Sequence, residues 1–110
     1  MDAKTQARYE ARARIMKALA HPTRLFIVDE LAKRQISVLE ITKLVGVDVS
    51  TVSKHLSILR SSGIVQDQKR GSKVFYSLRV PSLLNWYSCV EGVLKATAKE
   101  QMDAARGREE

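Results

Sequence analysis

The chain has 110 residues, of which 45% are hydrophobic and 28% are charged. This composition is that of a globular protein, and the length allows one domain but is too short for a second. No stretch of about 18 apolar residues is present, so we expect no membrane span. The single cysteine excludes an internal disulfide and any zinc finger or redox motif that needs two cysteines, while the net charge of +7 favours an anionic partner. Residues 1–10 lack the apolar stretch of a signal peptide, so we expect a cytoplasmic protein.

The first 45 residues predict three helices. Apolar residues recur at helical spacing from Tyr9 to Ala20, and the His21-Pro22 step ends this helix because the residue before proline is pushed out of the helical region. A second helix is expected over 22–33. Ser37 and Glu40 have the spacing of a capping box, in which each side chain satisfies a free backbone N–H, so a third helix should follow. Its apolar residues, which we expect to be buried, are Val38, Ile41, Leu44 and Val45.

A fourth helix is predicted from about Val49 to Ser62. Gly46 can end the preceding helix in the left-handed conformation, and Asp48 can cap the new one. At 100° per residue, the fourth helix has an apolar inner side and a small, polar outer side with one cation. The inner residues are Val52, Leu56 and Leu59, and the outer ones are Ser50, Lys54, Ser57 and Ser61.

After Gly63, the pattern predicts two strands over 64–69 and 73–80, joined at Arg70-Gly71-Ser72. Pro81 opens a last helix with an apolar stripe that is broad for so small a core. We therefore expect parts of this helix and of the first helix to pair with a second copy of the chain. The fold class is mainly helical (α+β), a single domain over 1–110 with an ordered core over 8–102 and a frayed tail over 104–110.

A short helix, a glycine-containing turn and a helix with a polar outer face predict a helix-turn-helix, whose second helix enters the major groove of DNA. The hairpin would then be a basic wing against phosphates, since residues 48–80 carry six basic and two acidic residues, a net +4. For His55, about 60° from the core line, a structural or phosphate-contacting role is favoured. The candidate DNA-binding residues are Ser50, Thr51, Ser53, Lys54, His55, Ser57, Lys69, Arg70 and Lys73.

Three stretches, in this order and spacing, resemble the ArsR/SmtB family of bacterial winged-helix repressors. They are residues 18–25 (ALAHPTRL), residues 52–60 (VSKHLSILR) with 62–65 (SGIV), and residues 70–78 (RGSKVFYSL). The resemblance spans nearly the whole chain. It implies a homodimer joined through the first and last helices, repression by binding a double-stranded DNA operator, and release when a metal or another inducer binds.

The chain departs from the family at the metal sites. Residues 37–40 are Ser-Val-Leu-Glu where many members have Cys-x-Cys, and residues 81–110 contain no histidine where others have metal ligands on the last helix. We therefore expect no metal or cofactor, and the inducer is unidentified. Val49 stands where many members have a polar residue such as glutamine, which favours an apolar contact, for example to a thymine methyl group.

Cys89 lies beside the apolar stripe of the last helix, so a buried structural role is the first interpretation, and a thiol-redox or thiophilic-ligand switch is the alternative. An enzyme is not expected, because the chain has no glycine-rich phosphate loop and no paired histidine with a nucleophile. The alternative to a DNA-binding repressor is a protein-interaction module that uses the last helix. Salt dependence of DNA binding separates the two.

Overall fold

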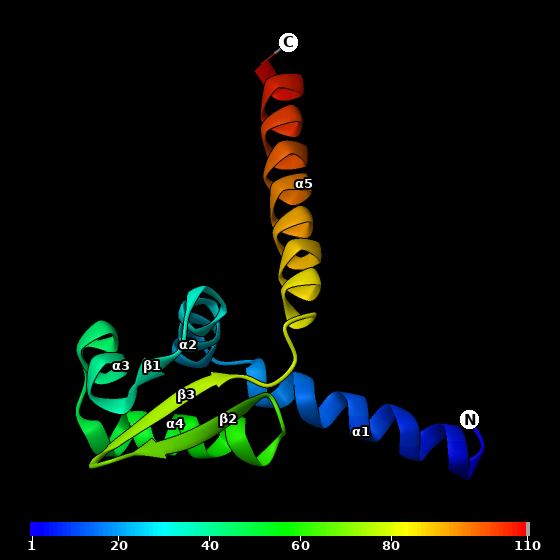
Figure 1. Cartoon of the computed structure of the whole chain (residues 1–110). Helices are drawn as coiled ribbons and strands as arrows, with labels where there is room; N and C mark the ends of the chain where they lie inside the picture. The colour runs from blue at the N-terminus through cyan, green and yellow to red at the C-terminus, as the bar shows by residue number, and fades with distance from the viewer. Residues whose placement is uncertain (110) are drawn as a thin grey trace. The chain divides into compact units, whose positions relative to one another are not determined.

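The computed structural model describes residues 1–109, which fall into two units divided after Val80. The second unit contains α5 (Leu83–Glu109). The predicted order of four helices, a hairpin and a last helix is confirmed (Figure 1). In chain order, the first unit contains α1 (Ala3–Leu19), α2 (Pro22–Lys33), β1 (Ile36–Ser37), α3 (Val38–Val45), α4 (Val49–Ser61), β2 (Val65–Arg70) and β3 (Lys73–Leu78).

Helix α1 begins six residues earlier than its apolar pattern indicates. The Asp2 carboxylate accepts a hydrogen bond from the Thr5 N–H at 2.7 Å and thereby caps the helix at Ala3. At the other end, His21 is extended and Pro22 occupies the first turn of α2, as the His-Pro step predicts. The His21 ring also caps α2, since its Nδ1 accepts from the Thr23 N–H at 3.1 Å.

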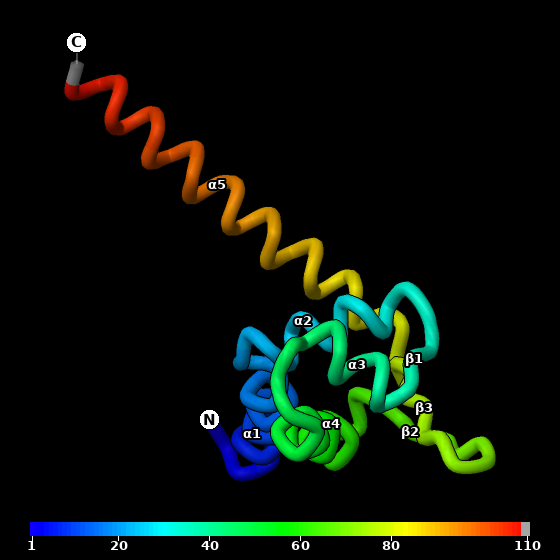
Figure 2. The backbone as a smooth tube through the Cα atoms, turned by 90° about the vertical axis from the view of Figure 1, so that its left-hand side faces the viewer, coloured from blue at the N-terminus to red at the C-terminus, as the bar shows by residue number. Residues whose placement is uncertain are grey.

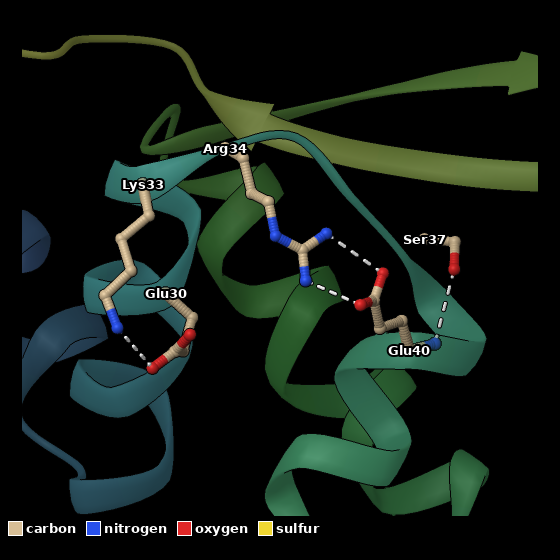
Figure 3. Close-up of polar contacts among 5 residues, drawn as sticks. All are labelled: Glu30, Lys33, Arg34, Ser37 and Glu40. Atoms are coloured by element: carbon tan, nitrogen blue, oxygen red, sulfur yellow. Dashed lines mark hydrogen bonds and ion pairs between the residues drawn. The ribbon is translucent and has the colours of Figure 1, made fainter.

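The capping box predicted at α3 forms only in part. Ser37 Oγ accepts from the Glu40 N–H at 3.3 Å, as expected. The Glu40 carboxylate, however, does not cap the helix but accepts two hydrogen bonds from the Arg34 guanidinium, at 3.1 and 2.5 Å (Figure 3). The planar guanidinium binds both carboxylate oxygens at once, and this pair joins the end of α2 to the start of α3.

The burial predicted for α3 is also only partly right. Ile41 is buried, whereas Val38 and Val45 are half-buried and Leu44 is 42% exposed. A helix of two turns is covered by α2, α4 and the sheet on one side only, so a stripe of four apolar residues is wider than the cover. Gly46 ends α3 with φ 81°, and Asp48 caps α4, both as predicted.

The sheet has three antiparallel strands in the order β1-β3-β2 among the residues described. The predicted hairpin pairs Val65 with Leu78 and Arg70 with Lys73, so the turn itself is Gly71-Ser72, with Gly71 at φ 61°. The third strand, β1, was not predicted, because two residues give no alternating pattern. It pairs Ile36 with Tyr76 and so closes the sheet over the core.

The core of the first unit lies among α2, α3, α4 and the sheet, and α1 contributes only its last residues (Figure 2). Its fully buried side chains come from every one of these elements, and no buried polar side chain occurs in the part of the chain described. The buried apolar residues are Ala18, Leu19, Ile27, Val28, Leu31, Ile36, Ile41, Val52, Leu56, Leu59, Ile64, Val65 and Tyr76.

Helix α5 begins at Leu83 and continues to Glu109, through most of the tail predicted to fray; Glu110 lies outside the described residues. Several of its apolar residues are exposed, including Val90, Val93 and Leu94. Cys89 is exposed as well, which corrects the expected buried position. No helix within residues 1–109 is long and apolar enough to cross a membrane.

Candidate nucleic-acid interface

The outer side of α4 carries the exposed polar residues that the helical period predicted. The four residues predicted there, Ser50, Lys54, Ser57 and Ser61, are all exposed. Of the other two candidates on α4, Ser53 is exposed and Thr51 is half-buried. On the inner side, Val52, Leu56 and Leu59 have at most 1% of their surface exposed. The helix is therefore anchored to the core by one side and presents small polar side chains and one cation on the other.

The Asp48 carboxylate organises the first turn of α4. Its Oδ2 accepts hydrogen bonds from the Thr51 N–H, at 3.2 Å, and from the Ser50 hydroxyl, and its Oδ1 accepts one from the Thr51 hydroxyl at 2.7 Å. The hydroxyl bonds of Ser50 and Thr51, followed by the Thr51 N–H bond, lower the pKa of Asp48 to about 2. The carboxylate is thus ionised at neutral pH, where it also interacts favourably with the helix dipole.

His55 is turned toward the α1–α2 junction rather than toward the outer side of α4. Its ring centroid lies 4.5 Å from that of His21, and its Nδ1 accepts a hydrogen bond from Arg24 Nε at 3.3 Å. Arg24 also donates to the Ala18 carbonyl at 2.9 Å. Burial, and then the charges of His21 and Arg24, lower the pKa of His55. This arrangement favours the structural role over phosphate contact.

The wing presents three exposed cations around the Gly71-Ser72 turn: Lys69, Arg70 and Lys73. The Arg70 guanidinium lies over the Phe75 ring, 5.3 Å from its centroid, and donates to Gln68 Oε1 at 3.2 Å. Figure 2 shows the hairpin tip projecting beyond the helices of the first unit. Charged groups at such a tip are accessible to a ligand outside the unit.

The wing and α4 are joined by an ion pair that sequence reasoning missed. Arg60 Nη1 of α4 lies 3.1 Å from Asp67 Oδ2 of β2. Arg24 was missed in the same way, since its partners, His55 and the Ala18 carbonyl, are contributed by other helices. The motif 18–25 was the signal that could have singled out Arg24.

The site residues of the sequence prediction thus fall into three groups. The serines, Thr51 and Lys54 share the outer side of α4, the three wing cations share the hairpin tip, and His55 belongs to the contact with α2. No group of three or more histidine, cysteine or acidic side chains that could hold a metal ion occurs within the described residues.

Comparison with known proteins places this helix-turn-helix in a family. The family model for bacterial regulatory proteins of the arsR family matches residues 21–67, from the start of α2 into β2. The transcriptional repressor PagR of Bacillus anthracis is 34% identical over 84 residues, 76% of this chain and 77% of PagR. The chain belongs to the ArsR family. The predicted family and the winged helix-turn-helix fold are both confirmed.

Two further comparisons of this ArsR-family chain support the same family and fold. The biofilm growth-associated repressor of Xylella fastidiosa is 38% identical over 66 residues, which cover 60% of this chain but only 58% of that protein. A homodimeric winged helix-turn-helix DNA-binding domain from Mycobacterium bovis, a possible ArsR-family regulator, superposes with a TM-score of 0.78 at 27% identity. That superposition covers 91% of this chain and 93% of the other.

Proposed function

We propose that this ArsR-family chain is a sequence-specific DNA-binding repressor that docks as a homodimer on an operator and is released by an unidentified inducer. The observation that carries the proposal is the outer side of α4, where exposed polar side chains stand on a helix whose other side is locked in the core. The major groove is about 12 Å wide and admits one such helix. Small side chains let the helix backbone approach the base edges closely.

The wing supports this docking electrostatically. With α4 in the groove, the cations at the hairpin tip would neutralise phosphates beside it. Three cations in each of two copies give roughly six phosphate contacts, which predicts a slope of about −5 for log affinity against log salt. The repressors among the relatives, PagR and the Xylella protein, favour repression as the outcome of this binding.

The homodimer is proposed from apolar residues that a single chain leaves exposed. On α1 these are Tyr9, Ile15 and Met16, each at least 43% exposed, and on α5 they include Val93 and Leu94. Pairing of α1 and α5 with a second copy would remove this surface from water. The Mycobacterium bovis domain is described as homodimeric, which supports a homodimer here. Two copies of α4 would then enter successive major grooves about 10 base pairs apart.

Fluorescence anisotropy tests the proposal, with the DNA upstream of the chain's own gene compared with an unrelated duplex over a series of salt concentrations. We expect tighter binding to the upstream duplex and a steep loss of affinity with salt. Weak binding to both duplexes with little salt dependence would overturn the proposal and favour the interaction-module alternative.

Three alanine variants locate the interface. Arg70→Ala removes one phosphate contact from each copy and should reduce the salt slope by about 2, whereas Lys54→Ala should weaken binding from within the groove. Lys33→Ala is the matched control, since Lys33 is an exposed cation that pairs with Glu30 and belongs to α2 rather than to α4 or the wing. Unchanged affinity in both Arg70→Ala and Lys54→Ala would contradict this docking.

A further inference from the structure

The first turn of α4 restricts the direction in which two of its hydroxyl groups can donate. Ser50 and Thr51 both donate to the Asp48 carboxylate, the latter at 2.7 Å. A hydroxyl has one proton to donate and two lone pairs that can accept. An ionised carboxylate has no proton, so in both contacts the hydroxyl must be the donor.

Each of these hydroxyl protons is therefore already used inside the protein. The lone pairs of the two oxygens are what remain for an outside partner. Ser50 is exposed and lies about 160° from Val52 around the helix axis, on the outer side of α4, and Thr51 is half-buried beside it. The first turn of α4 thus presents hydrogen-bond acceptors where a free serine or threonine would present either polarity.

We propose that Ser50, with Thr51 beside it, recognises exocyclic amino groups of bases, the N6 of adenine or the N4 of cytosine, and discriminates against positions that present only acceptors. The inference rests on the proposed function, because it assumes that α4 enters the major groove. In that groove, adenine and cytosine show an amino donor, whereas the edge of guanine shows the acceptors N7 and O6 and thymine shows O4.

Lys54 has the opposite chemistry one turn further along the outer side. Its ammonium group donates and cannot accept, so it suits guanine acceptors or a phosphate. The outer side of α4 thus begins with acceptors and continues with a donor. This order gives the operator a polarity: an amino-bearing base faces the start of the helix, and guanine or a phosphate faces Lys54.

The test uses a duplex selected by the protein from a random-sequence pool, with single bases replaced by analogues. Purine in place of adenine, or 2-pyrimidinone in place of cytosine, deletes only the amino group, and 7-deazaguanine deletes only the N7 acceptor of guanine. We expect one amino deletion to weaken binding of the parent protein by roughly 2- to 10-fold, the range of one hydrogen bond. The same deletion should have no effect on Ser50→Ala.

Comparing parent and variant on the same duplex cancels the effect of the analogue on base pairing. Ser61→Ala is the matched control, because it removes the same hydroxyl from an exposed position of α4 about 16 Å along the helix. Deleting the amino group should weaken DNA binding by Ser61→Ala as much as it weakens binding by the parent. The inference would be overturned if the selected duplex still binds but Ser50→Ala removes the effect of 7-deazaguanine instead, or changes the effect of no analogue. Failure to select any duplex would overturn the proposed function and the inference with it.

Asp48→Ala tests the cause of the directionality. Alanine has no acceptor oxygen, so both hydroxyls are released to donate, and the lost cap costs about 1 kcal/mol of stability. We expect the penalty for the amino deletion to fall in Asp48→Ala, with the α-helical circular dichroism of the parent. Asp48→Asn is the matched control, because its single carbonyl oxygen can keep the bonds from the Thr51 N–H and the Ser50 hydroxyl, which share Oδ2 in the parent. A penalty in Asp48→Ala equal to that of the parent would show that the carboxylate does not direct these hydroxyls.

Discussion

His55 and Leu56 are neighbours in α4 that hold the helix in place by different means. Leu56 is 1% exposed and contributes apolar packing. His55 contributes a hydrogen bond from Arg24, which in turn is bound to the Ala18 carbonyl, so one polar chain links α1, α2 and α4. Because the acceptor in this chain is a neutral imidazole nitrogen, its contribution depends on pH.

We predict that His55 makes the first unit less stable at mildly acid pH. Its pKa is lowered in the folded protein by burial and by the charges of His21 and Arg24. The unfolded chain therefore binds the proton first, and the stability contributed by neutral His55, present above about pH 6.5, is lost as the pH falls toward the lowered value. His55→Gln should lack this component. Urea unfolding of parent and variant over this range measures it.

The comparison with the variant isolates His55 from other titrating groups, which are shared by both proteins. Glutamine keeps an acceptor oxygen for Arg24, so the variant should remain folded. Parallel pH dependences of the two unfolding free energies would show that His55 does not titrate between the folded and unfolded states as expected.

At Cys89, the exposed position predicts a small effect of substitution. Cys89→Ser should change the free energy of unfolding by less than about 0.5 kcal/mol, because exposed side chains contribute little packing. Its DNA affinity under reducing conditions should equal that of the parent. Chemical unfolding and fluorescence anisotropy measure the two quantities. A loss of more than about 1 kcal/mol would indicate the buried role that the sequence favoured.

The same two proteins treated with diamide address the thiol-switch hypothesis. Equal DNA binding by parent and Cys89→Ser after oxidation would eliminate it. Only a loss of binding confined to the parent would make Cys89 the sensor.

At the level of elements, the two halves of the capping sequence at α3 should differ in their contribution to stability. Ser37→Ala should lower the free energy of unfolding by about 1 kcal/mol, because the Glu40 N–H loses its partner. Glu40→Gln should cost less, because it breaks an exposed ion pair with Arg34 that water and salt already screen.

Urea unfolding at low and high salt checks this prediction. The effect of Glu40→Gln should shrink as salt is added, and that of Ser37→Ala should not. A larger loss for Glu40→Gln than for Ser37→Ala at high salt would contradict the assignment of the two contacts shown in Figure 3.

At the level of the whole molecule, the proposed homodimer makes α5 sensitive to charge on its apolar stripe. Val93 is 65% exposed in the single chain, so Val93→Asp should leave the fold intact. In a dimer that covers this residue, the carboxylate would be buried without a partner, at a cost of about 3–5 kcal/mol. We therefore expect the dimer dissociation constant, measured by sedimentation equilibrium, to rise by roughly 100-fold or more.

Ser88→Asp is the control for this change. It adds the same charge to the same helix at an exposed position roughly 140° away from Val93. Its dimer affinity should resemble that of the parent. Equal dimer affinities for both aspartate variants would indicate that the stripe of α5 does not pair.

The local pattern of residues determined most of the architecture. Helix boundaries were predicted correctly where a proline, a capping side chain or a glycine marks them. These residues are Pro22, Ser37, Gly46 and Asp48. The inner and outer sides of α4 followed from the helical period, because Val52, Leu56 and Leu59 recur on one side and the polar residues on the other. The basic hairpin and the family resemblance likewise rest on short stretches of consecutive residues. Both the fold and the family are confirmed.

Only the tertiary structure decided which polar side chains meet. Arg34 binds Glu40 in place of the expected cap, Arg24 of α2 donates to His55 of α4, and Arg60 joins α4 to Asp67 of the wing. Strand β1 exists because Ile36 meets Tyr76, 40 residues away in the chain. Helical and strand periods describe neighbours along the chain, whereas a hydrogen bond or ion pair depends on where two separate elements pack. The polar contacts that join α4 to α2 and to the wing could for that reason not be predicted from the sequence, whereas α4 and its buried apolar side could.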